Sequence, residues 1–336
     1  MSVHLLSPAG KRPQAASRDL IGRLFHVACL CGTWFGVIAL AVLLGGILYQ
    51  AWGWLDWQFL TSYHSFRPAR AGVLAGLWGS MWLIFYTALF AVPVGVGAAV
   101  YLEEYAKGTW LTRLIQVNLA NLAGVPSIVY GILGLTVFVR NFGLFGKQTH
   151  DVAIPLFVTT LHIPLPLGRS VLSGAFTLSL LVLPVIIIAT QEALRAVPPS
   201  IRHASYALGA TKWQTIRYQV LPAALPGIST GVILALSRAI GETAPLVLLG
   251  IPVFITSTPG EIESVADFAR HPHGVLEAPF ATFTALPMII FKWIANPNAE
   301  FRHLAAAGCV VLLVLLLLLN AAALFVRQRF QKRIRW

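Results

Sequence analysis

The stretch SRAIGETAPL, residues 237–246, places Arg238 and Glu242 inside a run that is otherwise apolar, with GVILAL before it and VLLG after it. A charge at the centre of a bilayer costs about 2.5–3.5 kcal/mol on insertion scales. The two residues are four positions apart, so on a helix they project from nearly the same face and can pair, which lowers this cost. The stretch therefore predicts a membrane span at about residues 225–250 whose charged stripe faces protein rather than lipid.

Small residues flank the charged stripe at Gly231, Ala235 and Gly241, and small residues let a second helix approach closely. Two interpretations follow. The pair either pins helices together, or it lines a path for an anion, because an arginine offers a planar fork of donors that matches an oxyanion. Intramembrane charges are by default functional, which favours the path. On a continuous helix Thr243 points about 140° away from Arg238 and is the weaker candidate.

The composition places the whole chain in a membrane. Of its 336 residues, 57% are hydrophobic and only 11% are charged, whereas soluble domains contain about 25% charged residues. Three cysteines in apolar runs form no disulfide framework. We predict no metal site, because neither the Cys29–Cys31 pair nor the His271–His273 pair has further ligands nearby in the sequence.

Six stretches approach the roughly 20 apolar residues that a spanning helix needs. The expected spans are residues 24–50, 74–101, 117–139, 172–190, 225–250 and 303–326. We therefore expect an all-α polytopic membrane protein with a basic N-terminal tail at 1–23, a retained first transmembrane helix at 24–50, a core of five further transmembrane helices at 74–326, and a basic tail at 327–336.

The basic residues indicate how the chain is oriented. With six spans both termini lie on one side, and the segments on that side contain 15 of the 24 Lys and Arg residues. This is the positive-inside bias, so both termini are expected in the cytoplasm. It accounts for the net charge of +12 without nucleic acid. The terminal RQRFQKRIRW is then expected to anchor at the lipid headgroups.

Motifs for catalysis are missing from the sequence. It has no G-x-x-x-x-G-K-[ST] loop for ATP, no G-x-S-x-G nucleophile elbow and no H-E-x-x-H metal motif. We therefore expect no enzyme activity and no cofactor in this chain.

The longest inward segment, residues 191–224, predicts two short helices. Pro198 and Pro199 can start the first, and Gly209 can end it. Thr211 can cap the second, which Pro222 is expected to end. Two alternatives stay open: an amphipathic hairpin resting on lipid, or a docking element for a groove on a cytoplasmic partner.

The same inward segment contains a motif that resembles a known family. ASYALGATKWQTIRYQVLPAALPG, residues 204–227, resembles the EAA loop of ABC-importer permeases, which couples the permease to an ATPase. His203 stands where that pattern usually has Glu. The resemblance implies a coupling role for His203, Ala204, Ser205, Gly209, Ala210, Leu221 and Pro222.

Four motifs narrow the resemblance to the PstA-type family of phosphate-specific permeases. They are AVPVGVGAAVYLEEYA (91–106), AGVPSIVYGILGL (123–135), LPVIIIATQEALRAVP (183–198) and LALSRAIGETAPL (234–246). The resemblance implies the type I ABC-importer permease fold with six transmembrane helices. It also implies that Arg238 and Glu242, with Thr243 as a weaker candidate, line half of a path for inorganic phosphate.

The same resemblance implies the protein's partners and its cellular location. They are a PstC-like second permease in a heterodimer, a PstB-like cytoplasmic ATPase dimer that binds ATP and Mg, and a PstS-like periplasmic phosphate-binding protein, in the inner membrane of a bacterial cell. Three alternatives remain: a permease for another oxyanion such as sulfate or molybdate, a scaffold for phosphate-starvation signalling, and a standalone channel or ion-driven carrier.

Overall fold

The computed structural model describes residues 13–106, 108–140, 150–155, 160–165, 167–263, 267–270 and 272–331. Within these ranges the chain is helical apart from one antiparallel hairpin, β1 (His150–Pro155) with β2 (Thr160–Leu165). The chain divides into two units, residues 1–50 and 51–336.

The first unit consists of one long helix, α1 (Pro13–Ala51), whose last residue already belongs to the second unit. Its segment Gly22–Ala51 is long and apolar enough to cross a membrane. Large apolar side chains along it are exposed, for example Leu24 and Phe35. The helix begins at Pro13, inside the tail expected at residues 1–23.

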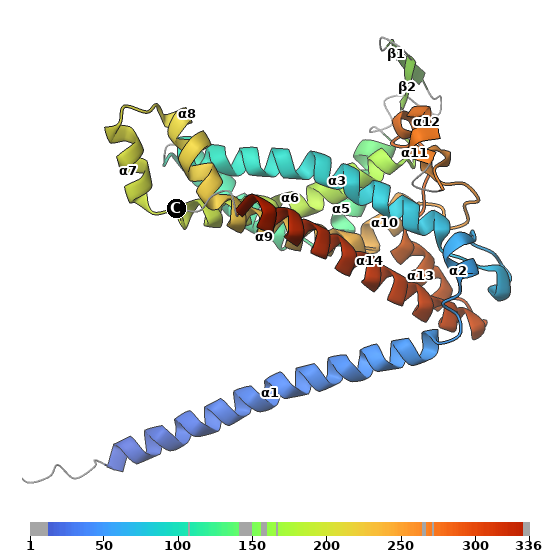
Figure 1. The fold of residues 1–336 in the computed structure, drawn as a ribbon, viewed down its shortest axis with the longest axis horizontal. Helices are drawn as coiled ribbons and strands as arrows, with labels where there is room; N and C mark the ends of the chain where they lie inside the picture. Colours follow the sequence, from blue (N-terminus) through green and yellow to red (C-terminus); the bar gives the residue numbers. More distant parts are fainter. Residues whose placement is uncertain are drawn as a thin grey trace, which may run out of the picture. The chain divides into compact units, whose positions relative to one another are not determined.

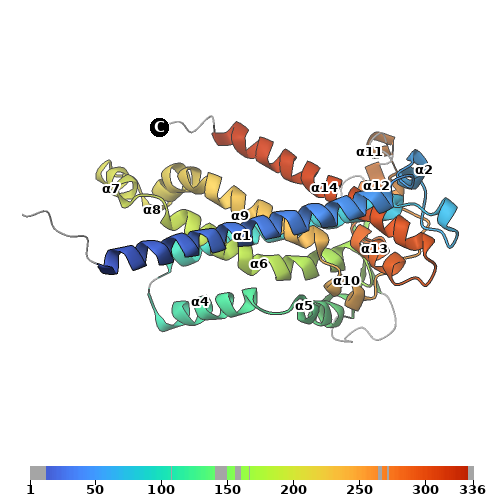
Figure 2. The ribbon, with the colours of Figure 1, turned by 90° about the horizontal axis from the view of Figure 1, so that it is seen from below.

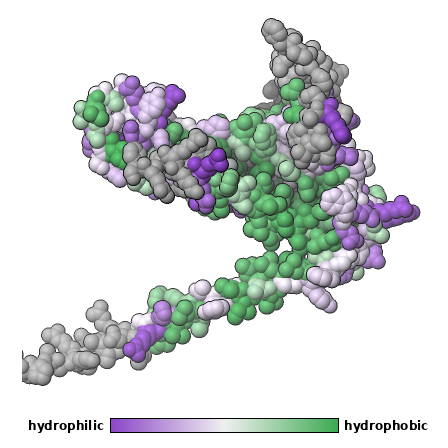
Figure 3. All heavy atoms as spheres, viewed as in Figure 1, coloured by the Kyte–Doolittle hydropathy of each residue, from purple (hydrophilic) through white to green (hydrophobic). Residues whose placement is uncertain are grey.

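The second unit contains four more straight helices that can span a membrane and one bent pair. The described residues thus provide five spans, or six when the bent pair counts as one, and the expected polytopic helical fold is confirmed. Figure 3 shows hydrophobic residues along the middle of this unit and hydrophilic residues near its ends. The β hairpin is the one departure from an all-α chain within the described residues.

The spanning segments of this unit combine α-helices with π-helical turns (Figure 1). They are α3 (Leu74–Val100) with η2 (Tyr101–Tyr105), α4 (Trp110–Ala123), α5 (Ser127–Gly134) with η3 (Leu135–Val139), α6 (Val171–Arg195), α8 (Lys212–Thr215) with η5 (Ile216–Val220) and α9 (Leu221–Gly241), and α14 (Glu300–Gln331).

Shorter helices lie at the two ends of the spanning helices (Figure 2). One end carries α7 (Pro199–Ala207) beside α8. The other end carries α2 (Trp57–Thr61), η1 (Pro68–Arg70), α10 (Ala244–Leu249), η6 (Pro259–Glu261), α11 (Asp267–Arg270), α12 (Pro272–Glu277) and α13 (Leu286–Ile294).

Helix α6 forms the centre of this unit, with α3, α5 and α9 packed around it. It is the spanning helix with the largest buried share. Its buried face is rich in small and hydroxyl residues such as Ser173 and Thr177, and the Thr177 hydroxyl donates to the carbonyl of Ser173 at 2.8 Å. Small side chains let helices approach closely, and the internal hydrogen bond satisfies the hydroxyl without water.

Two spans expected to be continuous are broken. The segment expected as one helix at 117–139 forms α4 and α5, which meet at an angle of 103° across Gly124–Pro126. Pro126 has no N–H and its ring clashes with the preceding turn of a regular helix, which favours a break at this position. Helix α5 packs against α10, where a Cβ on Gly131 would lie 2.8 Å from the Cα of Pro245.

Polar contacts join α9 to α14 along their length. Ser237 Oγ lies 2.5 Å from Asn320 Oδ1, and the Nη1 group of Arg327 donates to Thr230 Oγ1 at 2.7 Å. Hydrogen bonds between spanning helices of this kind are worth about 0.6–2 kcal/mol each. They hold α14 on one side of α9 and leave another side of α9 uncovered.

The end opposite α7 contains a partly buried histidine. His64 Nδ1 accepts a hydrogen bond from the indole N–H of Trp293 at 3.1 Å, and its ring centroid lies 4.4 Å from that of Phe254. Burial lowers the pKa of His64 to about 4. The imidazole is therefore neutral at physiological pH, as its acceptor role requires.

We expect Gly131→Ala to destabilise the folded chain by about 1–3 kcal/mol, because a Cβ there meets backbone that cannot move aside. Gly97→Ala is the matched control, since a Cβ on Gly97 meets no atom within 4 Å. The measurement is the melting temperature of the purified chain in detergent. Equal melting temperatures for the two variants would show that the α5–α10 contact does not constrain the fold.

We also expect a pH effect at His64. Its pKa is about 4 when folded, against 6.5 for the ordinary group, so the stability that it contributes is present above pH 6.5 and declines as the pH falls toward 4. Between pH 7.5 and 5.0 the melting temperature of His64→Asn, which keeps an acceptor, should fall less than that of the wild type. An identical fall in both proteins would mean that His64 does not cause the acid sensitivity.

Candidate functional site

The charged stretch lies at the end of a helix rather than in its middle. Helix α9 ends at Gly241, Glu242 has an extended backbone (φ −74°, ψ 116°), and α10 starts at Ala244. The continuous helix predicted over 225–250 is therefore wrong. Pro245 explains the break, because it lacks an N–H for the carbonyl of Gly241 and its ring clashes with that carbonyl in a regular helix.

The predicted ion pair is formed across this break. Arg238 Nε donates to Glu242 Oε1 at 3.3 Å. The side chain of Arg238 is 55% exposed, whereas that of Glu242 is 18% exposed. Among the described contacts Glu242 engages Nε, so the Nη1 and Nη2 groups keep their donors available. Together Nη1 and Nη2 form the edge of the guanidinium that can bind a phosphate or carboxylate group through two parallel hydrogen bonds.

Gly231, Ala235 and Gly241 lie on the same stripe of α9 as Arg238, since at 100° per residue each falls within about 60° of it. Gly231 and Ala235 are buried, and a Cβ on Gly231 would lie 2.4 Å from the Cβ of Ala189 on α6. Arg238 and Gly241 are exposed, together with Leu234. The stripe is therefore covered by α6 along its first part and open at its end, around Arg238.

Thr243 lies outside the helix that carries Arg238. It precedes α10 with φ −102° and ψ −39° and is half-buried. The angular argument that separated it from Arg238 assumed a continuous helix and does not apply here. Thr243 is adjacent to the ion pair in sequence, and no side-chain contact between them is among the described interactions.

The inward loop forms the predicted pair of short helices. Pro199 occupies the first turn of α7, Gly209 adopts φ +79° at the turn, and Thr211 caps α8 in a capping box with Gln214. A positive φ at the turn is easy only for glycine. The hydroxyls of Ser205 and Thr215 lie 2.8 Å apart and join the two arms of this hairpin, which we call the α7–α8 hairpin (residues 199–215).

The α7–α8 hairpin exposes an apolar tip. Leu208 is 88% exposed and Trp213 is 55% exposed, and His203 and Ala204 are exposed on α7. Ala210 is half-buried beside the glycine turn. Of the seven residues implied in coupling, five lie in this hairpin and two, Leu221 and Pro222, lie in the helix that follows.

Leu221 and Pro222 do not lie at the tip but in the spanning helix. The expected stop at Pro222 is wrong, because the helix runs from Lys212 to Gly241 without a break. The π-helical turn Ile216–Val220 directly precedes the proline. Its wider turn accommodates a ring that an α-helical turn would exclude. From Thr211 to Pro222 the helix rises about 16 Å, so these residues are well separated from the glycine turn.

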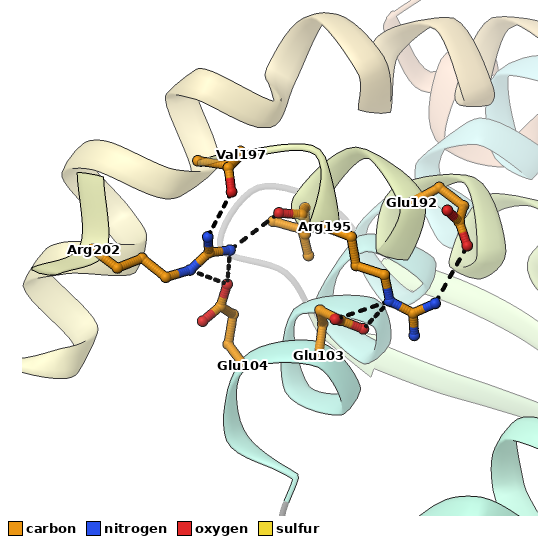
Figure 4. A network of polar contacts seen from close by, with 7 residues as sticks. Glu103, Glu104, Glu192, Arg195, Val197 and Arg202 are labelled. Atoms are coloured by element: carbon orange, nitrogen blue, oxygen red, sulfur yellow. Dashed lines mark hydrogen bonds and ion pairs between the residues drawn. The ribbon is translucent and has the colours of Figure 1, made fainter. Parts of the chain in front are cut away.

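Sequence reasoning missed an ion-pair network beneath the hairpin (Figure 4). Arg202 of α7 donates through Nη2 to Glu104 at 2.7 Å and to the carbonyl of Leu194 at 3.0 Å, and through Nη1 to the carbonyl of Val197 at 2.9 Å. The side chains of Arg202 and Glu104 are only 19% and 9% exposed. Arg202 therefore fastens α7 to the end of α6 and to η2.

A second, more exposed pair lies next to the first. Arg195 Nε donates to both oxygens of Glu103 at 2.9 and 3.0 Å, and its Nη1 group contacts Glu192 at 3.3 Å. The Arg195 side chain is 48% exposed. The adjacent acidic residues 103 and 104 were the available signal, because two carboxylates at the end of an apolar span are costly to bury unless cations pair with them.

The described residues contain no group of three or more potential metal ligands. What they contain is a set of spanning helices, two of them broken, with an open arginine at one break. Broken helices at mid-membrane sites are a feature of transport proteins.

These features define the chain as a membrane-embedded transport permease. The chain belongs to the family of binding-protein-dependent transport system inner membrane components, which matches residues 91–336. It is therefore a multi-pass membrane protein of an ABC-type transport system.

Known proteins agree with this assignment. The phosphate transport system permease protein PstA of Yersinia pestis is 30% identical over 87% of this chain and 89% of its own length. The permease protein PstC of Mesorhizobium japonicum is 34% identical over 67% and 70%. The solved structure of a bacterial alginate ABC transporter, in complex with an alginate-bound periplasmic protein, gives a TM-score of 0.59 at 14% identity over 95% of this chain. That similarity supports the fold alone.

We expect Glu104→Gln and Arg202→Gln each to destabilise the chain by about 3 kcal/mol, since each leaves a largely buried partner unpaired. Arg195→Gln is the matched control, and at an exposed pair it should cost less than about 1 kcal/mol. Thermal unfolding in detergent and a double-mutant cycle of Glu104 with Arg202 provide the measurement. A coupling energy near zero in that cycle would contradict this role.

Proposed function

We propose that this chain is the PstA-type permease subunit of an ATP-driven phosphate importer and forms half of the transmembrane path for inorganic phosphate. The similarity to PstA covers nearly the full length of both proteins, whereas the similarity to PstC covers about two thirds. This difference favours the PstA type for the present chain.

The observation that carries the proposal is the open arginine on α9. Arg238 lies in the last turn of α9, among apolar neighbours, and its side chain is 55% exposed in the isolated chain, so contact with lipid hydrocarbon is unfavourable for it. Water or another subunit is the better surrounding for this charge. An anion path between this chain and a second permease meets both conditions, because the path is hydrated and the second chain closes it.

The ion pair suits passage better than tight binding. Glu242 holds Arg238 through Nε, so the fork is oriented and the empty site is not a bare cation. Phosphate can then accept from Nη1 and Nη2, while the nearby carboxylate limits how strongly the anion is retained. A path needs binding that is favourable enough for entry and weak enough for release.

Energy for transport comes from a separate chain in this proposal. A PstB-like ATPase dimer binds ATP and Mg, and each ATPase subunit receives an α7–α8 hairpin in a groove. The exposed Leu208 at the glycine turn supplies the apolar anchor that such a helix-in-groove contact needs. Arg202 transmits movement of α7 to α3 and α6 through its contacts with Glu104 and Leu194.

The remaining partners follow from the same assignment. A PstC-like permease pairs with this chain, and a PstS-like phosphate-binding protein delivers the anion on the outer side. The complex works in the inner membrane of a bacterial cell, with both termini of this chain in the cytoplasm, as the positive-inside bias favours.

We expect Arg238→Gln to reduce phosphate uptake by roughly tenfold or more, because a hydrogen bond to a charged group contributes about 1.5–3 kcal/mol. The measurement is uptake of labelled phosphate by cells that carry the partner subunits and this chain as wild type, deleted or mutated. Arg329→Gln, an exposed arginine at the last turn of α14, is the control and should transport normally.

Two outcomes would overturn the proposal. Normal phosphate uptake by the Arg238→Gln variant, with the protein inserted in the membrane, would mean that the ion pair serves only to hold helices together. Uptake of sulfate or molybdate, with none of phosphate by the wild type, would assign a different oxyanion.

A further inference from the structure

An apolar groove follows the seam between α3 and the helix that leads from α8 into α9. Its volume is ≈ 630 Å³, within the roughly 300–1,000 Å³ of small-molecule sites. On α3, residues 92, 96 and 100 form one wall as a ridge of valines at intervals of four. Gly97 forms the floor, and a Cβ there would meet no atom within 4 Å. The absence of a side chain at this position leaves the floor of the groove open.

The polarity of the groove changes along its length. The end toward the middle of α3 is lined by Val92, Pro93 and Val96. The other end, beside the α7–α8 hairpin, is lined by Tyr101, Tyr105, Trp213 and Arg217. The Lys212 ammonium lies 5.0 Å from the centroid of the Tyr105 ring. Aromatic rings with Lys and Arg are the residues that collect at the headgroup level of a bilayer.

The cations at this end are not neutralised by neighbouring acids. Within the described residues, neither Lys212 nor Arg217 takes part in an ion pair, and the two acidic residues of η2 are held by Arg195 and Arg202. The end of the groove therefore presents two positive charges that an anion can occupy without displacing a carboxylate.

The seam points away from the proposed phosphate path. Farther along it, α9 contributes Leu236 and Ile240 to an apolar hollow shared with α3 and α14. Each is two residues from Arg238, or about 200° around the helix axis. The open Arg238 face and the α3 seam thus lie on nearly opposite sides of α9. This part of the seam is lined mainly by apolar side chains and suits lipid, whereas the open Arg238 face does not.

We propose that this groove binds one anionic phospholipid of the cytoplasmic leaflet. An acyl chain lies along Val92, Val96 and Val100 over Gly97, and the phosphate lies between Lys212 and Arg217, beside the Trp213 indole. The positive-inside bias places this end at the cytoplasmic leaflet, which carries the anionic lipids. The site does not depend on which solute the permease carries.

Its position gives the lipid an effect on the hairpin. Trp213 and Arg217 belong to the helix that starts at the Thr211 cap, so a lipid held there stabilises one arm of the α7–α8 hairpin against α3. Binding to the folded state raises its stability by mass action, and the melting temperature of the complex should therefore rise with added anionic lipid.

The test uses the purified permease–ATPase complex in detergent, with phosphatidylglycerol and phosphatidylcholine as probes. Native mass spectrometry counts the bound lipids, and the melting temperature is followed as each lipid is added. We expect the wild type to retain phosphatidylglycerol and to be stabilised by it at concentrations roughly tenfold or more below those of phosphatidylcholine.

Variants distinguish the part of the groove that binds the acyl chain from the part that binds the lipid headgroup. Gly97→Leu should fill the floor and abolish retention of both lipids, whereas Gly36→Leu, a helical glycine of α1 with equally open surroundings, should not. The double variant Lys212→Gln with Arg217→Gln should remove the preference for phosphatidylglycerol while retaining some phosphatidylcholine. Arg70→Gln, an exposed arginine at the other end, should change neither.

Three results would overturn the proposal. Equal stabilisation by both lipids, unaffected by Gly97→Leu, would indicate bulk lipid only. Loss of the ATPase from the double variant, with lipid binding intact, would assign the cations to the ATPase. A complex without lipid, in which Gly97→Cys is protected from a thiol reagent, would show that another helix covers the groove.

Discussion

A bilayer offers no water to polar groups, so each charge, hydroxyl and freed backbone group in a spanning segment needs a partner within the protein. This constraint organises the second unit. Thr177 on α6 donates to its own helix, and Ser237 meets Asn320 across the α9–α14 contact. Arg238 meets Glu242 across a helix break. The Ser237–Asn320 contact also joins two helices, and the small and hydroxyl residues of α6 allow α3, α5 and α9 to approach it closely.

The same constraint distinguishes the two ends of the permease. At the α10 end, the broken spans place α5 against α10, and an arginine remains open on α9. At the other end, Arg202 uses one guanidinium to satisfy Glu104, the carbonyl of Leu194 in the last turn of α6 and the carbonyl of Val197 just beyond that helix. Because these contacts are largely buried, α7 cannot move independently of the helices beneath it. This attachment is the route by which docking on the exposed tip of the hairpin can reach the membrane helices.

Particular residues mark where sequence reasoning succeeded and failed. The hairpin was predictable because its signals are local: prolines that start α7, a glycine with positive φ, and a threonine cap. The breaks at Gly124–Pro126 and at Glu242 carried prolines too, but prolines also occur inside intact helices here, such as Pro93 in α3 and Pro184 in α6. Whether a proline breaks a span depends on what satisfies the neighbouring carbonyls, and that is decided by packing. The Glu104–Arg202 pair joins residues 98 apart, beyond the reach of any helical period.

The sequence by itself determined the class of the protein, the number of apolar segments and the presence of paired charges in SRAIGETAPL. These follow from local composition and from the spacing of residues along a helix, and both can be read directly from the amino-acid sequence. Only the tertiary structure decided that α9 ends before Glu242, that Gly231 and Arg238 face different surroundings, and that α7 is fastened through Arg202. Those outcomes depend on which segments meet in space, because burial and partner choice set the free energy of a polar group inside a membrane.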